Sequence, residues 1–174
     1  MTTPARDGWH MPAEWAPHEA TWLAWPHERS DWPGKFTPIP WVYGEIIRHL
    51  TDEKVHLIVQ DAVEEKRARR LLARVGVPEE RVVYFRIPTD RVWMRDSGPI
   101  FVTKAGGEVA MTDWQFNAWA KYDNWRRDDQ VPTRINKRLR LPCWQPTVRG
   151  KRVVLEGGSI DVNGDGLLLT TEEC

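Results

Sequence analysis

The chain has 174 residues, and its 25 basic and 25 acidic side chains give a formal net charge of zero. This balance argues against a nucleic-acid scavenger or a polybasic membrane binder, so we expect neither nucleic acid nor a membrane as a partner. The length suits one ordinary domain or a piece of a larger one. No apolar run could span a bilayer, residues 1–15 lack the apolar segment of a signal peptide, and two cysteines make no disulfide framework, so a cytoplasmic location is predicted.

The first half of the chain is predicted to alternate strands with helices. Apolar runs bounded by turn residues predict strands at 20–26, 54–61 and 81–87. Helical spacing of apolar residues predicts helices at 41–51 and 62–76. The apolar face of the first helix is formed by Val42, Ile46, Ile47 and Leu50.

The second half mixes hairpins with one further helix. Two strands at 98–103 and 108–116 are joined by the turn "KAGG", and a helix is predicted at 128–140, with Pro132 near its start. Two more strands are predicted at 152–162 and 166–172. The pattern indicates an α/β chain built from a unit of two or three strands plus one helix, used more than once and without an internal linker.

The C-terminal residues match the spacing of an EF-hand calcium loop. Asp161, Asn163, Asp165, Gly166 and Glu172 fall at loop positions 1, 3, 5, 6 and 12. An EF-hand needs a helix on each side, whereas the flanking residues here favour strands. We therefore predict a hairpin with a two-residue Asn-Gly turn at 163–164, and the Asp-Gly pair at 165–166 offers the same turn chemistry. Calcium binding stays an alternative that depends on this motif alone.

A second motif, "RVWMRDSGPIFV" at 91–102, places Trp93 and Asp96 at the entrance of a strand. Side chains at such positions often converge on a functional site. The structural alternative is that Asp96 caps a turn through the amides of Ser97 and Gly98, or pairs with an arginine.

Four segments together resemble one known family. They are "MPAEWAPHEATWLAWP", "RVWMRDSGPIFV", "FNAWAKYDNW" and "VLEGGSIDVNGDGLLLTTEEC", and they resemble the agmatine deiminase family, which includes bacterial-type peptidylarginine deiminases. The resemblance covers nearly the whole chain and implies that residues 1–174 are the N-terminal portion of a single deiminase propeller domain, with no internal boundary. The implied fold is the α/β propeller of the guanidine-modifying (pentein) enzymes, with about two of its five ββαβ units present.

The resemblance also implies a reaction. The family hydrolyses agmatine to N-carbamoylputrescine and ammonia through a cysteine thiouronium intermediate, in putrescine and polyamine biosynthesis. It uses no metal and no organic cofactor. Agmatine, a small guanidine, is the implied partner, and a homodimer stays open for the full-length protein.

The same resemblance implies roles for three residues. Asp96 is a carboxylate that binds the forked, cationic guanidinium group, and Trp93 is a wall for the planar group or its aliphatic stem. Glu156 is the glutamate that orients the catalytic histidine; its structural alternative is a surface or hairpin carboxylate. Asn117 and Trp119 lie on a family motif without an assigned step.

The family's nucleophilic cysteine, catalytic histidine and second aspartate are expected beyond this chain. All five histidines lie in the first 56 residues, and Cys143 and Cys174 match no nucleophile motif. Two other interpretations stay open: a peptidylarginine deiminase of the same family, and a non-catalytic guanidine-binding fragment.

Overall fold

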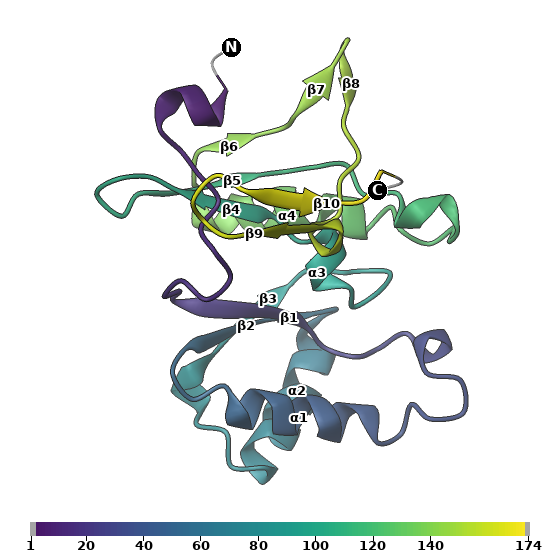
Figure 1. The fold of residues 1–174 in the computed structure, drawn as a ribbon. Coiled ribbons are helices and arrows are strands. Elements are labelled where there is room, and N and C mark those ends of the chain that lie inside the picture. Colours follow the sequence, from purple (N-terminus) through teal and green to yellow (C-terminus); the bar gives the residue numbers. More distant parts are fainter. Residues whose placement is uncertain (1–2, 173–174) are drawn as a thin grey trace. The chain divides into compact units, whose positions relative to one another are not determined.

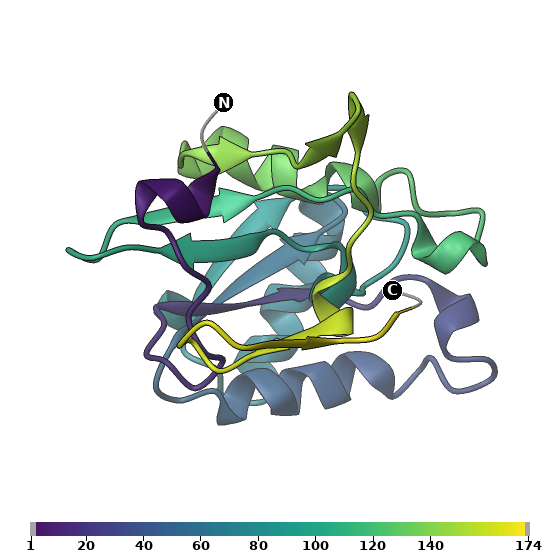
Figure 2. The same ribbon diagram turned by 45° about the horizontal axis from the view of Figure 1, so that its top comes forward.

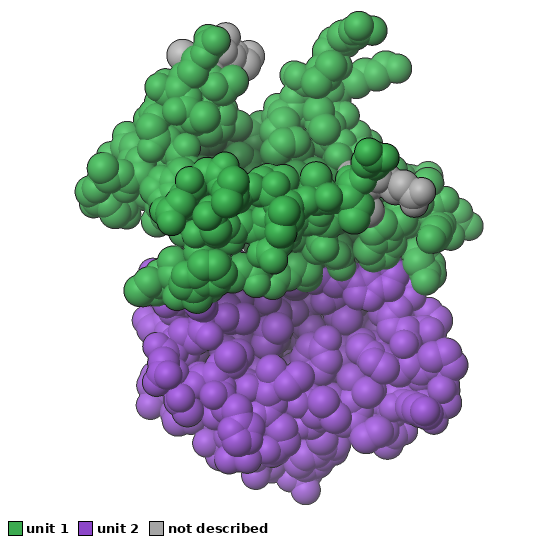
Figure 3. Space-filling view, viewed as in Figure 1, with its two compact units in different colours: residues 1–17, 95–174 green, residues 18–94 purple. Residues whose placement is uncertain are grey.

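The computed structural model describes residues 3–172 and divides into two compact units. One unit comprises Met1–Pro17 with Arg95–Cys174, and the other comprises His18–Met94, as the two colours of Figure 3 show. The assignment of residues 1–174 to a single propeller domain stays a prediction.

The unit His18–Met94 is a three-stranded parallel sheet with two helices, β1–α1–β2–α2–β3 (Figure 1). β2 lies between β1 and β3 and pairs with both in parallel register. Each strand and helix predicted in this half is present, with ends within a few residues of the expected ones. The bounds are β1 (Ala20–Ala24), η2 (Arg29–Asp31), α1 (Ile39–His49), β2 (Lys54–Val59), α2 (Ala62–Arg74), η3 (Glu79–Arg81) and β3 (Val82–Arg86).

The apolar face expected on α1 is only partly the face that is buried. Ile47 is fully buried, whereas Val42 and Ile46 are 49% and 45% exposed. The cause is the close approach of α1 to α2 at Gly44, where an added Cβ would lie 2.8 Å from Leu71 Cδ2. Because α1 touches α2 through its glycine side, part of its apolar stripe is turned away from the core.

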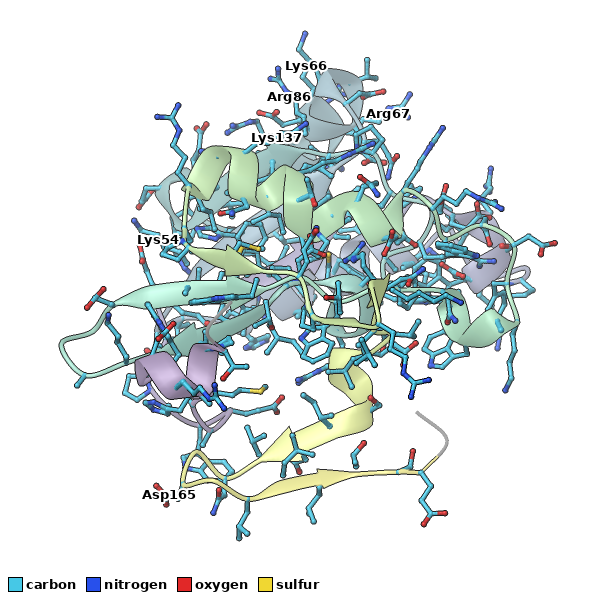
Figure 4. The ribbon with its side chains drawn as sticks, turned by 90° about the horizontal axis from the view of Figure 1, so that it is seen from above. Lys54, Lys66, Arg67, Arg86, Lys137 and Asp165 are labelled. Carbon is cyan, nitrogen blue, oxygen red and sulfur yellow. The ribbon has the colours of Figure 1, made fainter. Side chains whose placement is uncertain are left out.

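Helix α2 follows its sequence signals closely. Asp61 is its N-cap, and its Oδ1 accepts two backbone N–H groups of the first turn, both at 2.8 Å. Gly76, with φ of +79°, follows the end of the helix and closes it. Its solvent side carries Lys66 and Arg67, which project away from the sheet (Figure 4).

The other unit contains a ββαβ arrangement, the repeat expected from the family resemblance. β4 (Ile100–Thr103) pairs antiparallel with β5 (Val109–Thr112), and after α4 (Val131–Leu139) the chain returns as β6 (Cys143–Trp144), parallel to β5 (Figure 2). The remaining elements of the chain are η1 (Pro4–Asp7), α3 (Met94–Ser97), η4 (Ala118–Ala120), η5 (Asp128–Gln130), β7 (Thr147–Val148), β8 (Lys151–Arg152), η6 (Gly157–Ser159), β9 (Ile160–Val162) and β10 (Leu168–Thr170).

The segment 9–16 is braced against this unit along its length. The backbones of His10 and Thr103 exchange two hydrogen bonds of 2.9 Å, and Trp9 packs into the apolar cluster beneath β4 and β5. Ala13 is buried, and Gly164 approaches it so closely that an added Cβ would lie 2.9 Å from its nitrogen. These contacts fix the residues that follow Ala13.

The predicted C-terminal hairpin is confirmed, but its predicted two-residue turn is wrong. β9 and β10 pair antiparallel with Val162 opposite Leu168, so residues 163–167 all lie in the loop. Asn163 Oδ1 accepts the backbone N–H groups of Asp165 and Leu167 at 2.9 and 3.1 Å, which closes this wider turn. Asp165 lies at the exposed tip of the hairpin (Figure 4).

The calcium-like residues 161–172 therefore form part of a β-hairpin made by β9 and β10, whereas an EF-hand loop lies between two helices. Within residues 3–172 no group of three or more His, Cys, Asp or Glu side chains could hold a metal ion. In the same part of the chain, no helix is both long enough and apolar enough to cross a membrane.

Candidate functional site

Asp96 lies in the one-turn helix α3, which comes just before β4, so the strand entrance expected from the sequence is a short helix. Its side chain is half-buried, and no residue from 3 to 172 donates a hydrogen bond to its carboxylate. The cap to the amides of Ser97 and Gly98 is therefore not formed. Burial raises the pKa of Asp96 above its usual range, and the positive charge of Arg95 opposes that increase.

Glu156, the second predicted site residue, belongs to the same unit as Asp96, and the residue is only 3% exposed. It stands at the N-cap of η6, a turn held by Ser159, whose backbone N–H and Oγ both donate to the Glu156 carbonyl, at 3.0 and 2.7 Å. Burial raises the pKa of the Glu156 carboxyl group. A hydrogen bond from its own backbone N–H lowers this pKa, and the charge of Asp96 raises it further.

Two glycines bring the Asp96 and Glu156 segments into contact. A Cβ added to Gly157 would lie 2.5 Å from the Arg95 carbonyl oxygen, and one added to Gly158 would lie 2.4 Å from Asp96 Oδ1. Only a residue without a side chain fits at either position. This packing also explains why the strand predicted at 152–162 is interrupted: its two ends lie in β8 and β9, but between them the chain turns through η6 at 157–159 to meet α3.

Trp93, the third predicted site residue, belongs to the unit His18–Met94. The Arg91 guanidinium lies 5.0 Å from the centre of its ring, and Arg91 in turn is ion-paired with Asp31 in η2. The Trp93 ring is thus already a surface on which a guanidinium stacks. The role of Trp93 beside Asp96 stays a prediction.

The chemistry of the Asp96–Glu156 pair suits a planar cation. The charge of Asp96 raises the pKa of the neighbouring Glu156 carboxyl group, so the two groups together favour either a shared proton or a bound cation. A carboxylate without an internal donor can accept paired N–H bonds from a guanidinium, the strongest type of hydrogen bond in proteins. The pair therefore forms a candidate cation site.

Cys143 is not placed as a nucleophile. It lies at the surface in β6, where desolvation raises the pKa of its thiol, Asp113 raises it further and Arg152 lowers it. An activated cysteine has a lowered pKa, because the thiolate is the attacking form. Cys174, the other cysteine, lies outside the described residues.

Comparison with known proteins identifies the class as deiminases. The profile of the Porphyromonas-type peptidyl-arginine deiminase family matches residues 10–174, and the chain belongs to this family. It is 41% identical to the agmatine deiminase of Ectopseudomonas mendocina (strain ymp) and 38% identical to that of Pseudomonas fluorescens (strain SBW25). Each match covers 99% of this chain and 46% of the relative, so the chain spans about half the length of these proteins, which fits an N-terminal portion.

Solved structures agree with the sequence comparison. The agmatine deiminase of Enterococcus faecalis superposes with a TM-score of 0.83 at 30% identity, covering 99% of this chain and 46% of that one. A substrate-bound cysteine-to-serine variant of C. jejuni agmatine deiminase gives 0.75 at 28% identity, covering 93% and 45%. The predicted α/β propeller fold class and the family resemblance are confirmed.

Sequence reasoning missed the contacts that assemble the site. The tandem glycine after Glu156 was a visible signal, since paired glycines often mark a close backbone approach. The partner of that approach, Arg95, and its ion pair with Glu14 carried no signal in the sequence alone.

Proposed function

We propose that this chain is the N-terminal part of an agmatine deiminase, which hydrolyses agmatine to N-carbamoylputrescine and ammonia. The relatives at 35–41% identity bear this name. The proposal includes a role in putrescine biosynthesis, a cytoplasmic location, no cofactor and a small guanidine as the partner.

Within this reaction, Asp96 accepts N–H groups of the substrate guanidinium and so orients its central carbon. Trp93 stacks against the planar group or the aliphatic stem. The attacking cysteine thiolate and the histidine come from the remainder of the enzyme, and Glu156 orients that histidine. The thiolate adds to the carbon, ammonia leaves, and water then releases the urea product from the thiouronium. The cysteine-to-serine substitution in the substrate-bound C. jejuni enzyme is consistent with a cysteine nucleophile there.

The observation that carries the proposal is the Asp96 carboxylate, half-buried and without a hydrogen-bond donor from residues 3–172. The direct test is calorimetric titration of the chain with agmatine. We expect Asp96→Asn to weaken binding by about 100-fold, because it removes one member of a desolvated charged pair worth roughly 3 kcal/mol. The matched control is Asp165→Asn at the exposed hairpin tip, which makes the same change of charge. Equal agmatine affinity of the two variants would exclude Asp96 as the guanidinium ligand.

Turnover is tested with a chimera in which this chain precedes the remaining residues of the E. mendocina enzyme. We expect the 174-residue chain alone to release no ammonia and the chimera to form the carbamoyl product, detected by a citrulline-type colour assay. Preference for an arginine-containing peptide over agmatine would favour the peptidylarginine alternative. Agmatine binding without turnover by a folded chimera would favour a non-catalytic guanidine-binding module. Light scattering on the chimera would report whether it is a homodimer.

A further inference from the structure

A guanidinium of the protein itself lies next to the proposed guanidinium ligand. Arg95 directly precedes Asp96, and both side chains flank Gly158, where an added Cβ would be 3.3 Å from Arg95 Cγ and 2.4 Å from Asp96 Oδ1. Arg95 could therefore compete with the substrate guanidinium for the Asp96 carboxylate. Yet no hydrogen bond joins the two side chains within the described part of the chain.

The Arg95 guanidinium is held elsewhere, by Glu14. Arg95 Nη1 donates to Glu14 Oε1, and this bond is the largest contribution that raises the pKa of Arg95. Desolvation of the guanidinium lowers the pKa of Arg95. The charges of Asp96 and Asp161 make smaller contributions that raise it. Three carboxylates thus attract one guanidinium, and Glu14 is the one that binds it.

Glu14 is well placed for this task because its backbone is braced on both sides. Ala13 is buried against Gly164, and the Ala16 N–H donates to the Ala13 carbonyl at 3.0 Å, which closes a turn around Glu14. The carboxylate is therefore presented from a fixed segment and not from a mobile terminus.

We propose that Glu14 is a positioning residue that holds the Arg95 guanidinium away from Asp96, so that the Asp96 carboxylate stays available to a substrate guanidinium. This inference rests on the proposed function. The Glu14 and Arg95 side chains are 49% and 59% exposed, and ion pairs at this exposure contribute little to folding stability. The role of the pair is to decide which carboxylate Arg95 contacts.

The test uses Glu14→Gln, Arg95→Ala and the double variant in the 174-residue chain. Agmatine is the calorimetric probe, and carbon-13 NMR follows the Asp96 carboxyl group. We expect Glu14→Gln to weaken agmatine binding about tenfold, because Arg95 then forms a charge-assisted bond with Asp96. Arg95→Ala alone, and the double variant, should bind at least as tightly as the parent chain. If Glu14 only supports the fold, adding Arg95→Ala to Glu14→Gln should not restore the agmatine affinity.

The NMR titration tests the positioning role of Glu14 without agmatine. The pKa of Asp96 should fall in Glu14→Gln, as Arg95 approaches, and rise in Arg95→Ala, as the cation is lost. The matched control is Glu108→Gln, which removes the surface partner of Lys104 in the same unit with the same change of charge. It should move neither quantity.

Two outcomes would overturn the proposal: an Asp96 titration in Glu14→Gln that coincides with that of the parent chain, or agmatine binding that stays weak in the double variant. If the parent chain binds no agmatine, the proposed function fails in this chain, whereas the opposite shifts of the Asp96 pKa would still establish the positioning role. Melting curves accompany each variant, and unchanged midpoints are expected.

Discussion

Replacing Gly158 by alanine tests most directly whether the Asp96 site is assembled as described. The added Cβ would lie 2.4 Å from Asp96 Oδ1, whereas ordinary contacts begin near 3.4 Å. The Gly158 φ is not in the left-handed region, so alanine itself causes no backbone strain. The carboxylate must therefore move by about 1 Å, a displacement that can reduce the function of a site by roughly 100-fold.

The neighbouring glycine provides an internal comparison. At Gly157 the new Cβ would meet the Arg95 carbonyl oxygen at 2.5 Å, and backbone moves less easily than the end of a side chain. We expect Gly157→Ala to lose about 1–3 kcal/mol of unfolding free energy through overpacking. Gly158→Ala should lose less stability and more agmatine affinity.

The assay pairs calorimetry with agmatine and chemical denaturation for each variant. Gly107→Ala is the control, because its Cβ would meet nothing within 4 Å and only the positive φ of +80° is strained. It should lose stability without losing affinity. Parent-like agmatine binding by Gly158→Ala, together with an unshifted Asp96 carboxyl resonance, would refute the contact between Gly158 and Asp96.

Three further predictions concern stability and ions. Ala120→Gly should raise the unfolding free energy by about 1 kcal/mol, because Ala120 has a φ of +56°, which glycine adopts without strain. Ala73→Gly should lower it by a similar amount, because Ala73 lies inside the helix α2. Urea unfolding that shows a change of the same sign for both variants would contradict this. Burial raises the pKa of folded Glu156 above its unfolded value, so its contribution to stability is full below the unfolded pKa and is lost as the pH rises through the folded one. Glu156→Gln should thus be more stable than the parent near pH 7 and lose that advantage towards pH 4, and equal urea midpoints at both pH values would be evidence against a raised pKa. Calcium titration of the chain should be flat, since residues 161–172 contain β10 and most of β9, and a dissociation constant below about 10⁻⁴ M would show that the hairpin interpretation is wrong.

The sequence alone was sufficient to predict most helices and strands and to identify the family. β2 was predicted from its apolar run and α2 from the helical spacing of its apolar residues, because these signals act over a few residues. The family was recognised from four separated motifs in the right order, and the comparisons confirm it. Trp93, Asp96 and Glu156 were named from those motifs, and their roles stay proposals.

Only the tertiary structure decided how those residues meet. Asp96 and Glu156 are far apart in the sequence and are brought together by backbone contacts at Gly157 and Gly158 that no local pattern encodes. The same holds for Glu14, which reaches Arg95 because the segment around it is braced by β4 and the β9–β10 loop. Spacing along the chain determines which secondary structure a segment can form. The contacts between segments depend on packing across the whole unit. Those contacts determine that Glu14, and not Asp96, binds the Arg95 guanidinium.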